Sequence, residues 1–491
     1  MKYQRLLEGL EVSEILLSQV LTASYSGRID STFFLKEYLN HESFEFSYKL
    51  NQIANIKSGT TPADRDDDLK EGVMLLKTNN IRNNILNKYS DINYFIYEEV
   101  NKKMKSSELK EYDVLVNIVG ATLDVVGRVG YVTNSLPKSN ITQAMSFLRL
   151  KNEYKTDFIP AYLFIFLQSK FGKIQLNRHA RPTGQYNLNN EELGAVRVIK
   201  LDISVQEKIE ELVNISLSTL IESNQFYQSA QNLLLDHLGL KDFNLPAQAV
   251  NIKSFADSFG TSGRLDAEFY QEKYDVLVQK LKAQEYDELK NLVSVKKSIE
   301  PGSSAYDEQG LPFIRVSDYD KFQISSPAKY LSESYCRENH ETLKNLLPKK
   351  GTILFSKDGT VGIAHLLSED LNGISSGAIL HLKVKDKRVL PEYLTLVLNS
   401  FAVQMQAERD VGGSIIQHWR VEEIKEVVIP IISMEIQTQI ADLIRQSNYL
   451  RIKSKGLLEK AKKAVELAIE KDQESALDFI KGKQTNDCNV H

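Results

Sequence analysis

Two polar loops of the sequence place arginine beside amide and aromatic side chains. The first loop spans residues 177–187 and the second spans residues 409–420. Arginine can grip a phosphate or the O6/N7 edge of guanine, and asparagine or glutamine can pair with N6/N7 of adenine. The loops therefore predict contact with nucleic acid through eight candidate residues, namely Arg178, Arg181, Gln185, Tyr186, Arg409, Gln417, His418 and Arg420.

Three shorter loops add candidates with the same chemistry. Two of them follow apolar runs, at residues 77–82 and 315–319, and the third, residues 356–360, offers backbone amides and a lysine that would suit a phosphate. Any one of these loops could equally be a solvated connector, but matched placement in both halves of the chain favours the set. The further candidates are Lys77, Asn79, Arg82, Arg315, Ser317 and Lys357.

Motifs for catalysis are missing from the sequence. None of the 11 prolines adjoins another, which excludes the Asn/Asp-Pro-Pro-aromatic loop of adenine methyltransferases. Gly172-Lys173 lacks the glycine five places earlier that a phosphate loop needs. The histidines show no metal-ligand spacing, and Asp64 and Asp68 fit a solvated loop better than a magnesium-dependent nuclease. We expect a protein that is not an enzyme and that binds no metal.

The composition is typical of a soluble globular protein with more than one domain. The chain has 491 residues, of which 42% are hydrophobic and 26% charged, and no apolar run reaches the length of a membrane span. Cys336 and Cys488 are too few for a disulfide framework or a zinc site, so we expect reduced thiols in a cytoplasmic protein. The net charge of −4 is unusual for a nucleic-acid binder and requires its basic side chains to be gathered apart from its acidic ones.

The chain repeats itself, and the repeat defines its architecture. Residues 26–34 read Ser-Gly-Arg-Ile-Asp-Ser-Thr-Phe-Phe, and residues 262–270 read Ser-Gly-Arg-Leu-Asp-Ala-Glu-Phe-Tyr. Further segments agree at offsets between 231 and 239, including the apolar runs at 72–77 and 310–315 and the Val/Ile-Gln pairs that end at Gln206 and Gln437. The two halves are therefore predicted to share one fold.

Each half is predicted to contain a mixed α/β globular region followed by a long helix. Short Val-, Ile-, Phe- and Tyr-rich runs broken by turn residues fill residues 44–200 and 285–430, and helical spacing then takes over at 205–238 and 435–469. Apolar and small residues alternate three and four apart in both helices, which indicates a coiled-coil seam. The seam positions are Ile209, Leu212, Ser216, Thr219, Ser223, Phe226, Ala230 and Leu233, matched by Ile440, Leu443, Ser447, Leu450, Ser454, Leu457, Ala461 and Ala464.

We predict an α+β protein with an internal pseudo-twofold repeat, whose two long helices pack as an antiparallel coiled coil. Packing inside one domain is the alternative explanation of a single such heptad, and its repetition after each globular region favours a rod. The predicted segments are a first globular domain with its N-terminal helical part, a first long helix, a second globular domain, a second long helix and a polar tail. Their bounds are 1–200, 201–242, 243–432, 433–480 and 481–491.

This order of globular region, long helix, globular region and long helix resembles the specificity subunits of type I restriction-modification systems. The resemblance rests on the paired strands at 72–76 and 310–314 and on the paired helix starts at Gln206 and Gln437. It implies two target-recognition domains that read the two parts of a split double-stranded DNA site, with the helices setting an unread gap. It also implies two copies of an N6-adenine methyltransferase subunit and ATP-dependent restriction/translocase subunits as partners. S-adenosylmethionine, ATP and Mg²⁺ would then sit on those partners and not on this chain.

Two other functions stay open at this point. The same halves and rods would serve the specificity partner of a fused restriction-methylation enzyme that cuts on both sides of its site. Alternatively, the paired helices could assemble proteins as a scaffold, with globular regions that bind protein or glycan and not DNA. The differing loops at 178–187 and 409–420 indicate that any two half-sites differ in sequence.

Overall fold

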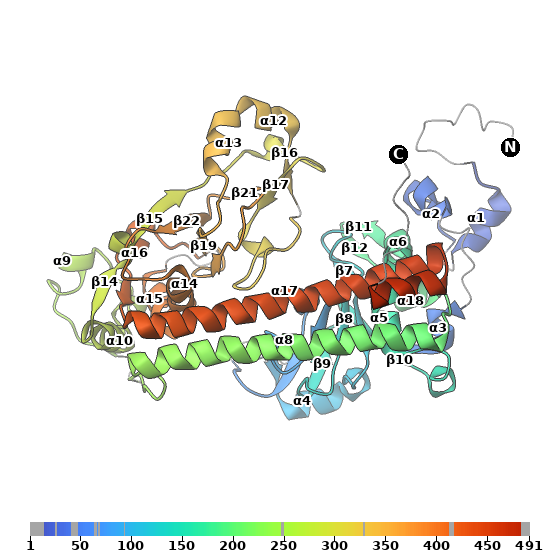
Figure 1. Cartoon of the computed structure of the whole chain (residues 1–491), viewed down its shortest axis with the longest axis horizontal. Coiled ribbons are helices and arrows are strands. Elements are labelled where there is room, and N and C mark those ends of the chain that lie inside the picture. The colour runs from blue at the N-terminus through green and yellow to red at the C-terminus, as the bar shows by residue number, and fades with distance from the viewer. Residues whose placement is uncertain are drawn as a thin grey trace. The chain divides into compact units, whose positions relative to one another are not determined.

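A computed structural model describes residues 14–24, 27–40, 48–62, 66, 69–92, 94–246, 250–327, 329–411 and 417–482 (Figure 1). The chain divides into two compact units. Unit 1 comprises Met1–Ile221 with Arg451–His491, and unit 2 comprises Glu222–Leu450. The division cuts through both long helices, so each unit contains one globular region together with a stretch of each helix.

Unit 1 is built around a sheet of strand order β2-β10-β6-β8-β4, in which four strands run antiparallel and β4 pairs parallel with β8. Its core gathers the apolar α5 and α6 against this sheet and against the N-terminal turns of α8. The helices are α1 (Leu17–Ala23), α2 (Lys36–Asn40), α3 (Leu50–Ile53), α4 (Glu98–Lys103), α5 (Pro160–Gln168), α6 (Lys170–His179), α7 (Asn190–Ala195) and α18 (Gln473–Lys481). The strands are β1 (Tyr48–Lys49), β2 (Ala54–Ser58), β3 (Val73–Leu76), β4 (Asn84–Leu86), β5 (Phe95–Ile96), β6 (Val114–Asn117), β7 (Val119–Gly120), β8 (Val129–Val132), β9 (Ser139–Ile141), β10 (Met145–Leu150), β11 (Arg181–Thr183), β12 (Gln185–Asn187) and β13 (Arg197–Val198).

Unit 2 repeats this plan with a sheet of order β15-β22-β19-β20. Its core places α14 and α15 against the sheet and against the second half of α8. The helices are α9 (Phe259–Ser262), α10 (Glu272–Lys282), α11 (Leu289–Leu292), α12 (Glu333–Glu338), α13 (His340–Leu346), α14 (Pro391–Leu398), α15 (Phe401–Asp410) and α16 (Val421–Lys425). The strands are β14 (Tyr286–Glu288), β15 (Val293–Lys297), β16 (Tyr306–Asp307), β17 (Leu311–Ile314), β18 (Tyr330–Leu331), β19 (Ile353–Ser356), β20 (Ala364–Leu366), β21 (Ile374–Ser375), β22 (Ile379–Val384) and β23 (Val428–Pro430).

The repeat seen in the sequence is a repeat of strand pairing. The order β2-β10-β6-β8 in unit 1 corresponds to β15-β22-β19-β20 in unit 2, and the parallel pair β3 with β9 corresponds to β17 with β21. The predicted apolar runs at 72–77 and 310–315 form β3 and β17. The prediction of two mixed α/β regions with one fold is therefore confirmed.

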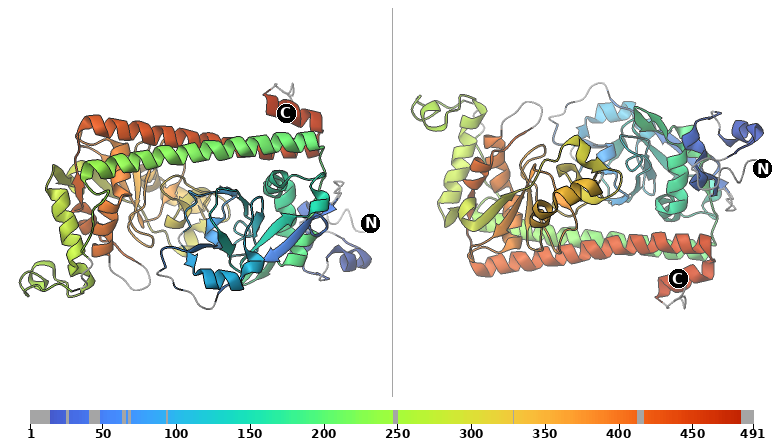
Figure 2. Two further views of the ribbon diagram at one scale, coloured as in Figure 1. Left: turned by 90° about the horizontal axis from the view of Figure 1, so that it is seen from below. Right: turned by 90° about the horizontal axis from the view of Figure 1, so that it is seen from above.

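The two long helices are α8 (Ile203–Leu238) and α17 (Met434–Glu470), each within two residues of the helical spacing at 205–238 and 435–469. The segment 433–480 predicted for the second long helix also includes the separate α18. Every predicted seam residue is buried or half-buried, including Ile209, Ala230, Ile440 and Ala461, which are fully enclosed. Figures 1 and 2 show α8 in green beside α17 in red. The seam prediction is therefore confirmed. The sequence could reveal the seam because its three-four spacing is a local property of the chain.

Buried serines let the two helices approach closely. In unit 1 the hydroxyls of Ser216 and Ser454 lie 2.8 Å apart, and Ser216 Oγ also donates to Ser454 O. In unit 2 Ser223 Oγ donates to Ser447 O at 2.7 Å. A small side chain whose hydroxyl bonds to the facing backbone satisfies its polar atom without forcing the helices apart. From the first pair to the second, the residue number rises along α8 and falls along α17, so the two helices run antiparallel.

A buried glutamine fastens each long helix to its own globular region. Gln206 accepts from Ile159 N and donates to Asp157 O and Leu201 O, at 2.8–2.9 Å. Gln437 accepts from Leu390 N and donates to Arg388 O and Ile432 O, at 2.7–2.9 Å. The two side chains make the same three bonds in the two units, which explains why glutamine recurs at this place in the sequence.

Among the described residues, no helix is both long enough and apolar enough to cross a membrane.

Candidate nucleic-acid interface

In both units a glycine-bearing segment pairs with a predicted DNA-contacting loop. In unit 1, β7 pairs with β12, so that Gly120 faces Tyr186 and Val119 faces Asn187. In unit 2, Asp358 forms an isolated bridge with His418, and Gly359 N donates to Gln417 O at 2.9 Å. These pairings lie at matching places in the repeat. In each unit, two segments that are more than 50 residues apart in sequence are thus side by side. We call the two pairings the reading segments.

The loops after β3 and β17 adopt matching turns. Lys77 N donates to the side chain of Asn80 at 2.8 Å, and Arg315 N donates to the side chain of Asp318 at 2.9 Å. In unit 1 the side chain of Asn117, at the end of β6, donates to Thr78 O at 2.9 Å. This bond joins the loop to the strand that leads into β7, so the first turn lies beside the reading segment of unit 1.

The corresponding turn of unit 2 contacts its own glycine loop by a different bond. The hydroxyl of Tyr319 donates to Ile363 O at 3.1 Å, and Ser356 N donates to the same carbonyl. Burial strongly raises the pKa of Tyr319, so its hydroxyl stays protonated and available as a donor. The segment 315–319 therefore adjoins the segment 356–360, so the turn after β17 lies beside the reading segment of its own unit.

The reading segment of unit 1 presents mostly neutral groups. Gln185 is exposed and Tyr186 is half-buried, while Arg181 is paired with the buried carboxylate of Glu192 at 2.5 Å. In the adjoining turn, Asn79 and Arg82 are exposed, and Lys77 Nζ lies 3.1 Å from the ring centroid of Tyr94. An amide, a phenol and an exposed arginine are groups that can contact base edges and phosphates.

The reading segment of unit 2 carries a connected set of polar side chains. Lys357 Nζ contacts Asp358, whose other oxygen lies 2.9 Å from His418 Nδ1. The His418 side chain is 62% exposed, whereas those of Lys357 and Asp358 are mostly covered. Gln417, which precedes His418 in the sequence, is exposed. In the turn after β17, Ser317 is exposed and Arg315 is paired with Asp318 at 3.2 Å.

Two predicted contact residues lie away from the reading surface. Arg178 is buried, donates to Phe33 O at 3.0 Å and stacks on the Phe33 ring. Arg409 is largely covered, pairs with Asp410 at 2.7 Å and lies over the ring of Phe269. The structure therefore assigns both arginines to packing beneath the loops. The sequence could not show this, because the aromatic partners lie more than 130 residues away along the chain.

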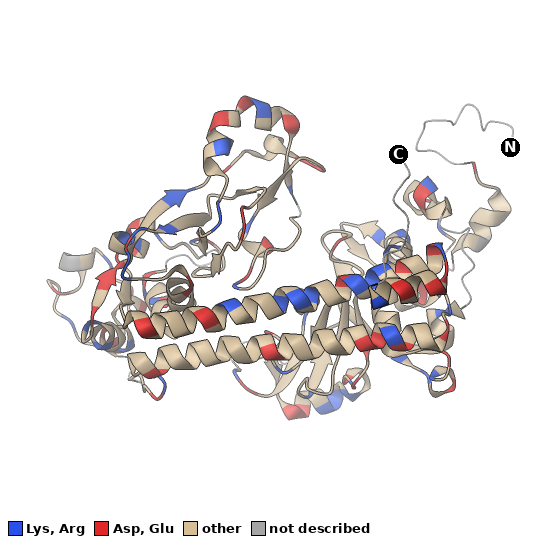
Figure 3. Cartoon of the chain, in the orientation of Figure 1, with Lys and Arg blue, Asp and Glu red and all other residues tan. Residues whose placement is uncertain are grey.

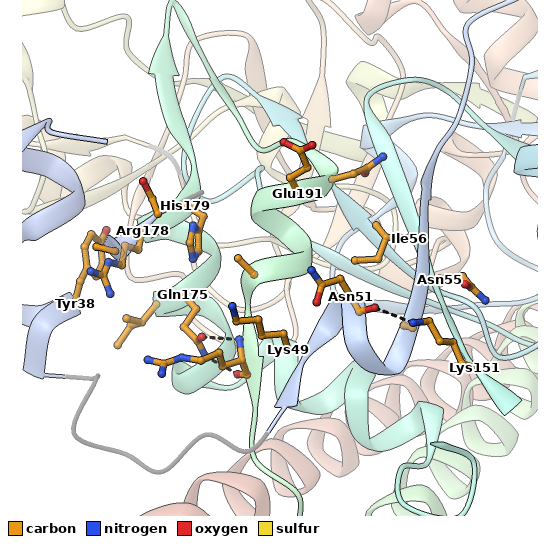
Figure 4. A pocket seen from close by; sticks show the side chains of 17 residues that line it. Tyr38, Lys49, Asn51, Asn55, Ile56, Lys151, Gln175, Arg178, His179 and Glu191 are labelled. Atoms are coloured by element: carbon orange, nitrogen blue, oxygen red, sulfur yellow. Dashed lines mark hydrogen bonds between the residues drawn. The ribbon is translucent and has the colours of Figure 1, made fainter. Parts of the chain in front are cut away.

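A cavity of about 790 Å³ in unit 1 does not coincide with the reading segment (Figure 4). Its lining includes Lys49, Asn51, Lys151, Gln175, Arg178 and His179, and Arg178 is its one member among the predicted contact residues. Burial together with nearby arginines lowers the pKa of His179 to about 4, so this histidine is neutral at pH 7. The predicted contacts thus belong to protruding loops and not to this hollow.

Figure 3 shows how the charge of the long helices is distributed. Acidic residues cluster at the start of α8, at Glu207, Glu210 and Glu211, while residues 451–463 of α17 carry six lysines and arginines. Within the described part of the chain, no group of three or more His, Cys, Asp or Glu side chains is arranged to hold a metal ion. Asp64, Asp68, Cys488 and residues 412–416 of the second predicted loop lie outside the described residues.

Residues 284–463 match the family described as type I restriction modification DNA specificity domain. The second half of the chain carries this specificity domain. The match covers β14 to β23 and most of α17, so it includes the reading segment of unit 2. It confirms the resemblance stated from the sequence.

The chain is similar in sequence to a known specificity subunit and to several solved structures. The Type I restriction enzyme EcoBI specificity subunit of Escherichia coli is 29% identical over 145 residues, which are 29% of this chain and 28% of that protein. The match thus spans less than a third of the relative. Similar solved structures include the type I S subunit of M. genitalium, with 11% identity, 89% and 96% of the two chains covered and a TM-score of 0.35. The HsdS subunit of Thermoanaerobacter tengcongensis gives 13% identity, 90% and 97% coverage and a TM-score of 0.27.

The sequence prediction missed the acidic partners within the specificity domain. Asp358 orients Lys357 and His418, and Glu423 binds the exposed Arg420 at 2.9 Å. Glu423 has a counterpart in unit 1, where Glu192 binds Arg181. The matched positions of Glu192 and Glu423, 231 residues apart, are the signal from which these two glutamates could have been found.

Proposed function

We propose that this chain is a non-catalytic specificity subunit that reads a split, asymmetric double-stranded DNA site. The observation that carries the proposal is the doubling of the reading segment, with one copy inside the DNA specificity domain and its counterpart in unit 1. Each unit would read one half-site. Since the side chains on the two segments differ, the two half-sites would differ as well.

In this proposal the chain positions enzymes and performs no reaction itself. Two copies of an N6-adenine methyltransferase subunit would bind it and carry S-adenosylmethionine, and restriction/translocase subunits would carry ATP and Mg²⁺. The complex would act on DNA in the cytoplasm. The net charge of −4 is compatible with DNA binding, because partner subunits can neutralise phosphates while this chain aims a few base contacts.

Methylation mapping tests the proposal directly. The chain is co-expressed with the methyltransferase encoded beside it in a host that lacks adenine methylation, and modified adenines are mapped across the genome. We expect one asymmetric motif in two parts with a constant gap. A complex that forms but methylates no defined motif and binds no DNA would instead support the scaffold function.

Exchanging one globular region tests the assignment of one unit to one half-site. When residues 44–200 are replaced by the equivalent region of another specificity subunit, we expect one half of the motif to change and the other half to stay. A motif that stays whole would contradict the assignment.

Shortening α8 tests the role of the helices as the ruler. Deleting about two turns, roughly seven residues at 3.6 residues per turn, should alter the gap or abolish activity without changing the bases read. Altered base preference at an unchanged gap would contradict this role.

A further inference from the structure

The repeated Ser-Gly-Arg-x-Asp-x-x-Phe segments at residues 26–33 and 262–269 have no part in the proposed reading, yet they recur almost unchanged. In unit 1, Arg28 is buried, and its Nη1 donates to Arg178 O at 3.0 Å and to His179 O at 3.1 Å. These are the last carbonyls of α6. In unit 2, Arg264 Nη1 donates to Asp410 O, the last carbonyl of α15, at 2.7 Å.

The aspartate two residues later fixes each guanidinium. Asp30 accepts from Nε and Nη2 of Arg28 at 2.7 and 2.8 Å, and Asp266 accepts from the same atoms of Arg264 at 2.9 and 2.6 Å. A two-bond arginine-carboxylate pair sets the orientation of the guanidinium as well as its position. The bond from Arg28 lowers the pKa of Asp30 to about 2, so the pair stays charged at all ordinary pH values.

The phenylalanine at the end of each segment completes the cluster. The Phe33 ring lies 4.8 Å from Arg28 Cζ and 4.4 Å from Arg178 Cζ, and the Phe269 ring lies 4.4 Å from Arg264 Cζ and 5.5 Å from Arg409 Cζ. Two guanidinium groups therefore lie against each ring, one from the repeated segment and one from the last turn of α6 or α15. We call Arg28, Asp30, Phe33 and Arg178 the first clamp, and Arg264, Asp266, Phe269 and Arg409 the second clamp.

The first clamp acts where α6 leads into the reading segment of unit 1, and the second clamp holds the end of α15, seven residues before Gln417. The last carbonyls of a helix have no partner within it, and a cation there satisfies them and opposes the helix dipole. Strand β11 begins at Arg181, three residues after Arg178, and β11 pairs with β12 of the reading segment. The clamp therefore holds the backbone from which the loop departs.

We infer that the two clamps are positioning devices, each of which sets the path of the reading segment of its own unit. This inference rests on the proposed DNA-reading function. Arg28 and Arg264 act through the helix ends and touch no DNA. Loss of one clamp then affects one half-site only.

The test uses the full chain in complex with its methyltransferase and two DNA libraries, each randomised in one half-site. For Arg28→Ala we expect discrimination between right and wrong bases in the half-site of unit 1 to fall by about tenfold, the scale of one good base contact. Discrimination in the other half-site should stay as in the unchanged protein. Arg264→Ala should give the mirror result.

Conservative variants keep the test usable if an alanine variant fails to fold. Arg28→Lys can still donate to the helix carbonyls but cannot bind Asp30 by two bonds, so it should recover part of the lost discrimination. Asp30→Asn should lose part of it. The matched control is Arg388→Ala, because Arg388 is likewise bound to an aspartate two residues away, Asp386 at 2.8 Å, but its side chain caps no helix. The control should leave both half-sites unchanged.

Hydrogen exchange of the same variants separates the two possible failures. Arg28→Ala should speed exchange at residues 178–187 and leave the interior of α5 unchanged. Equal loss at both half-sites, or unchanged discrimination together with unchanged exchange, overturns the clamp. If the unchanged protein reads no split site while Arg28→Ala still speeds exchange locally, the DNA-reading function fails and the clamp is only structural.

Discussion

Units 1 and 2 hold their reading segments with the same backbone bonds but line them with different chemistry. Leu188 N donates to Ile118 O in unit 1, and Trp419 N donates to Lys357 O in unit 2, both at 2.8 Å. Around these equal bonds, unit 1 has Val119 and Asn187 where unit 2 has Asp358 and His418. The framework is common to both units, and the groups offered to a ligand are specific to each.

The two units also differ in the buried side chains of their sheets. Phe147 on β10 and His381 on β22 occupy the same place, and each is buried. His381 bonds to the hydroxyl of Ser375 at 2.7 Å, whereas the matching position in unit 1 is Ile141. Unit 2 thus contains a polar pair where unit 1 contains two apolar side chains.

The largest effect is expected from the shared framework. Gln206→Leu and Gln437→Leu should each lower the free energy of unfolding by about 3 kcal/mol, because each leaves one buried N–H and two carbonyls without their partner. Urea unfolding of the two variants measures this. Gln225→Leu, on an exposed position of α8, is the control and should change little. Clearly unequal losses for the two glutamines would break the equivalence of the units.

A pH-dependent effect of about 2–3 kcal/mol is expected from His381. Burial, helped by the charge of Lys296, lowers its pKa from 6.5 to about 4. Between those values the unfolded chain binds a proton that the folded chain does not, so stability falls as pH falls from 6.5 to 4. His381→Phe should remove this part of the acid sensitivity.

Trp419 provides the measurement for His381, since it is the one tryptophan of the sequence and is buried in unit 2. Its fluorescence during urea unfolding at several pH values reports on unit 2. His340→Phe, at an exposed position of the same unit, is the matched control and should keep the full pH dependence. The same pH dependence in His381→Phe as in the unchanged protein would contradict the prediction.

A smaller loss is expected at the helix seam. Ser216→Leu and Ser447→Leu should each cost about 1–3 kcal/mol, because the facing backbone leaves no room for a larger side chain. Ser216→Ala should cost less, since Ser454 Oγ keeps its bond to Ser216 O at 2.9 Å. Urea unfolding compares them with Ser218→Leu, which changes an exposed serine of α8. If leucine at either seam position leaves the free energy of unfolding unchanged, the helices do not pack closely there.

The smallest effect is expected from a substitution in the reading segment of unit 2. Asp358→Val gives unit 2 the residue that unit 1 has at this place, and it removes the partner of His418 and Lys357. We expect discrimination at one half-site to fall about tenfold, equivalent to roughly 1.4 kcal/mol. Non-specific DNA affinity should be kept, because the substitution removes a negative charge that repels phosphates. Binding to matched and scrambled half-sites measures both quantities. Equal loss on every sequence would contradict a role in reading.

Local patterns predicted the framework well. The three-four spacing of α8 and α17 and the alternation of strands and turns are properties of short stretches of chain, and the repeat supplied each of them twice. Gln206 and Gln437 were noticed as recurring residues, although their bonds to Ile159 N and Leu390 N became apparent only in the structure.

The candidate contact residues were predicted less completely. Arg178 and Arg409 were selected because arginine suits phosphate, but each stacks on a phenylalanine from the start of its own half. Arginine serves both purposes equally well, so its type alone could not decide between them. For the other predicted contacts, including Gln185, Gln417 and Arg82, DNA binding stays a prediction.

The serine pairs of the long helices have a consequence for the origin of the chain. Ser447 and Ser454 lie 231 residues after Ser216 and Ser223, which is the offset of the repeat. The two contacts, Ser216 with Ser454 and Ser223 with Ser447, are therefore equivalent: each joins one position of the repeat to the other. A protein made of the first half alone would already contain both members of each pair. Two copies of such a half-length ancestor, laid head to tail, would form the same two contacts, and joining their genes would preserve them in a single chain.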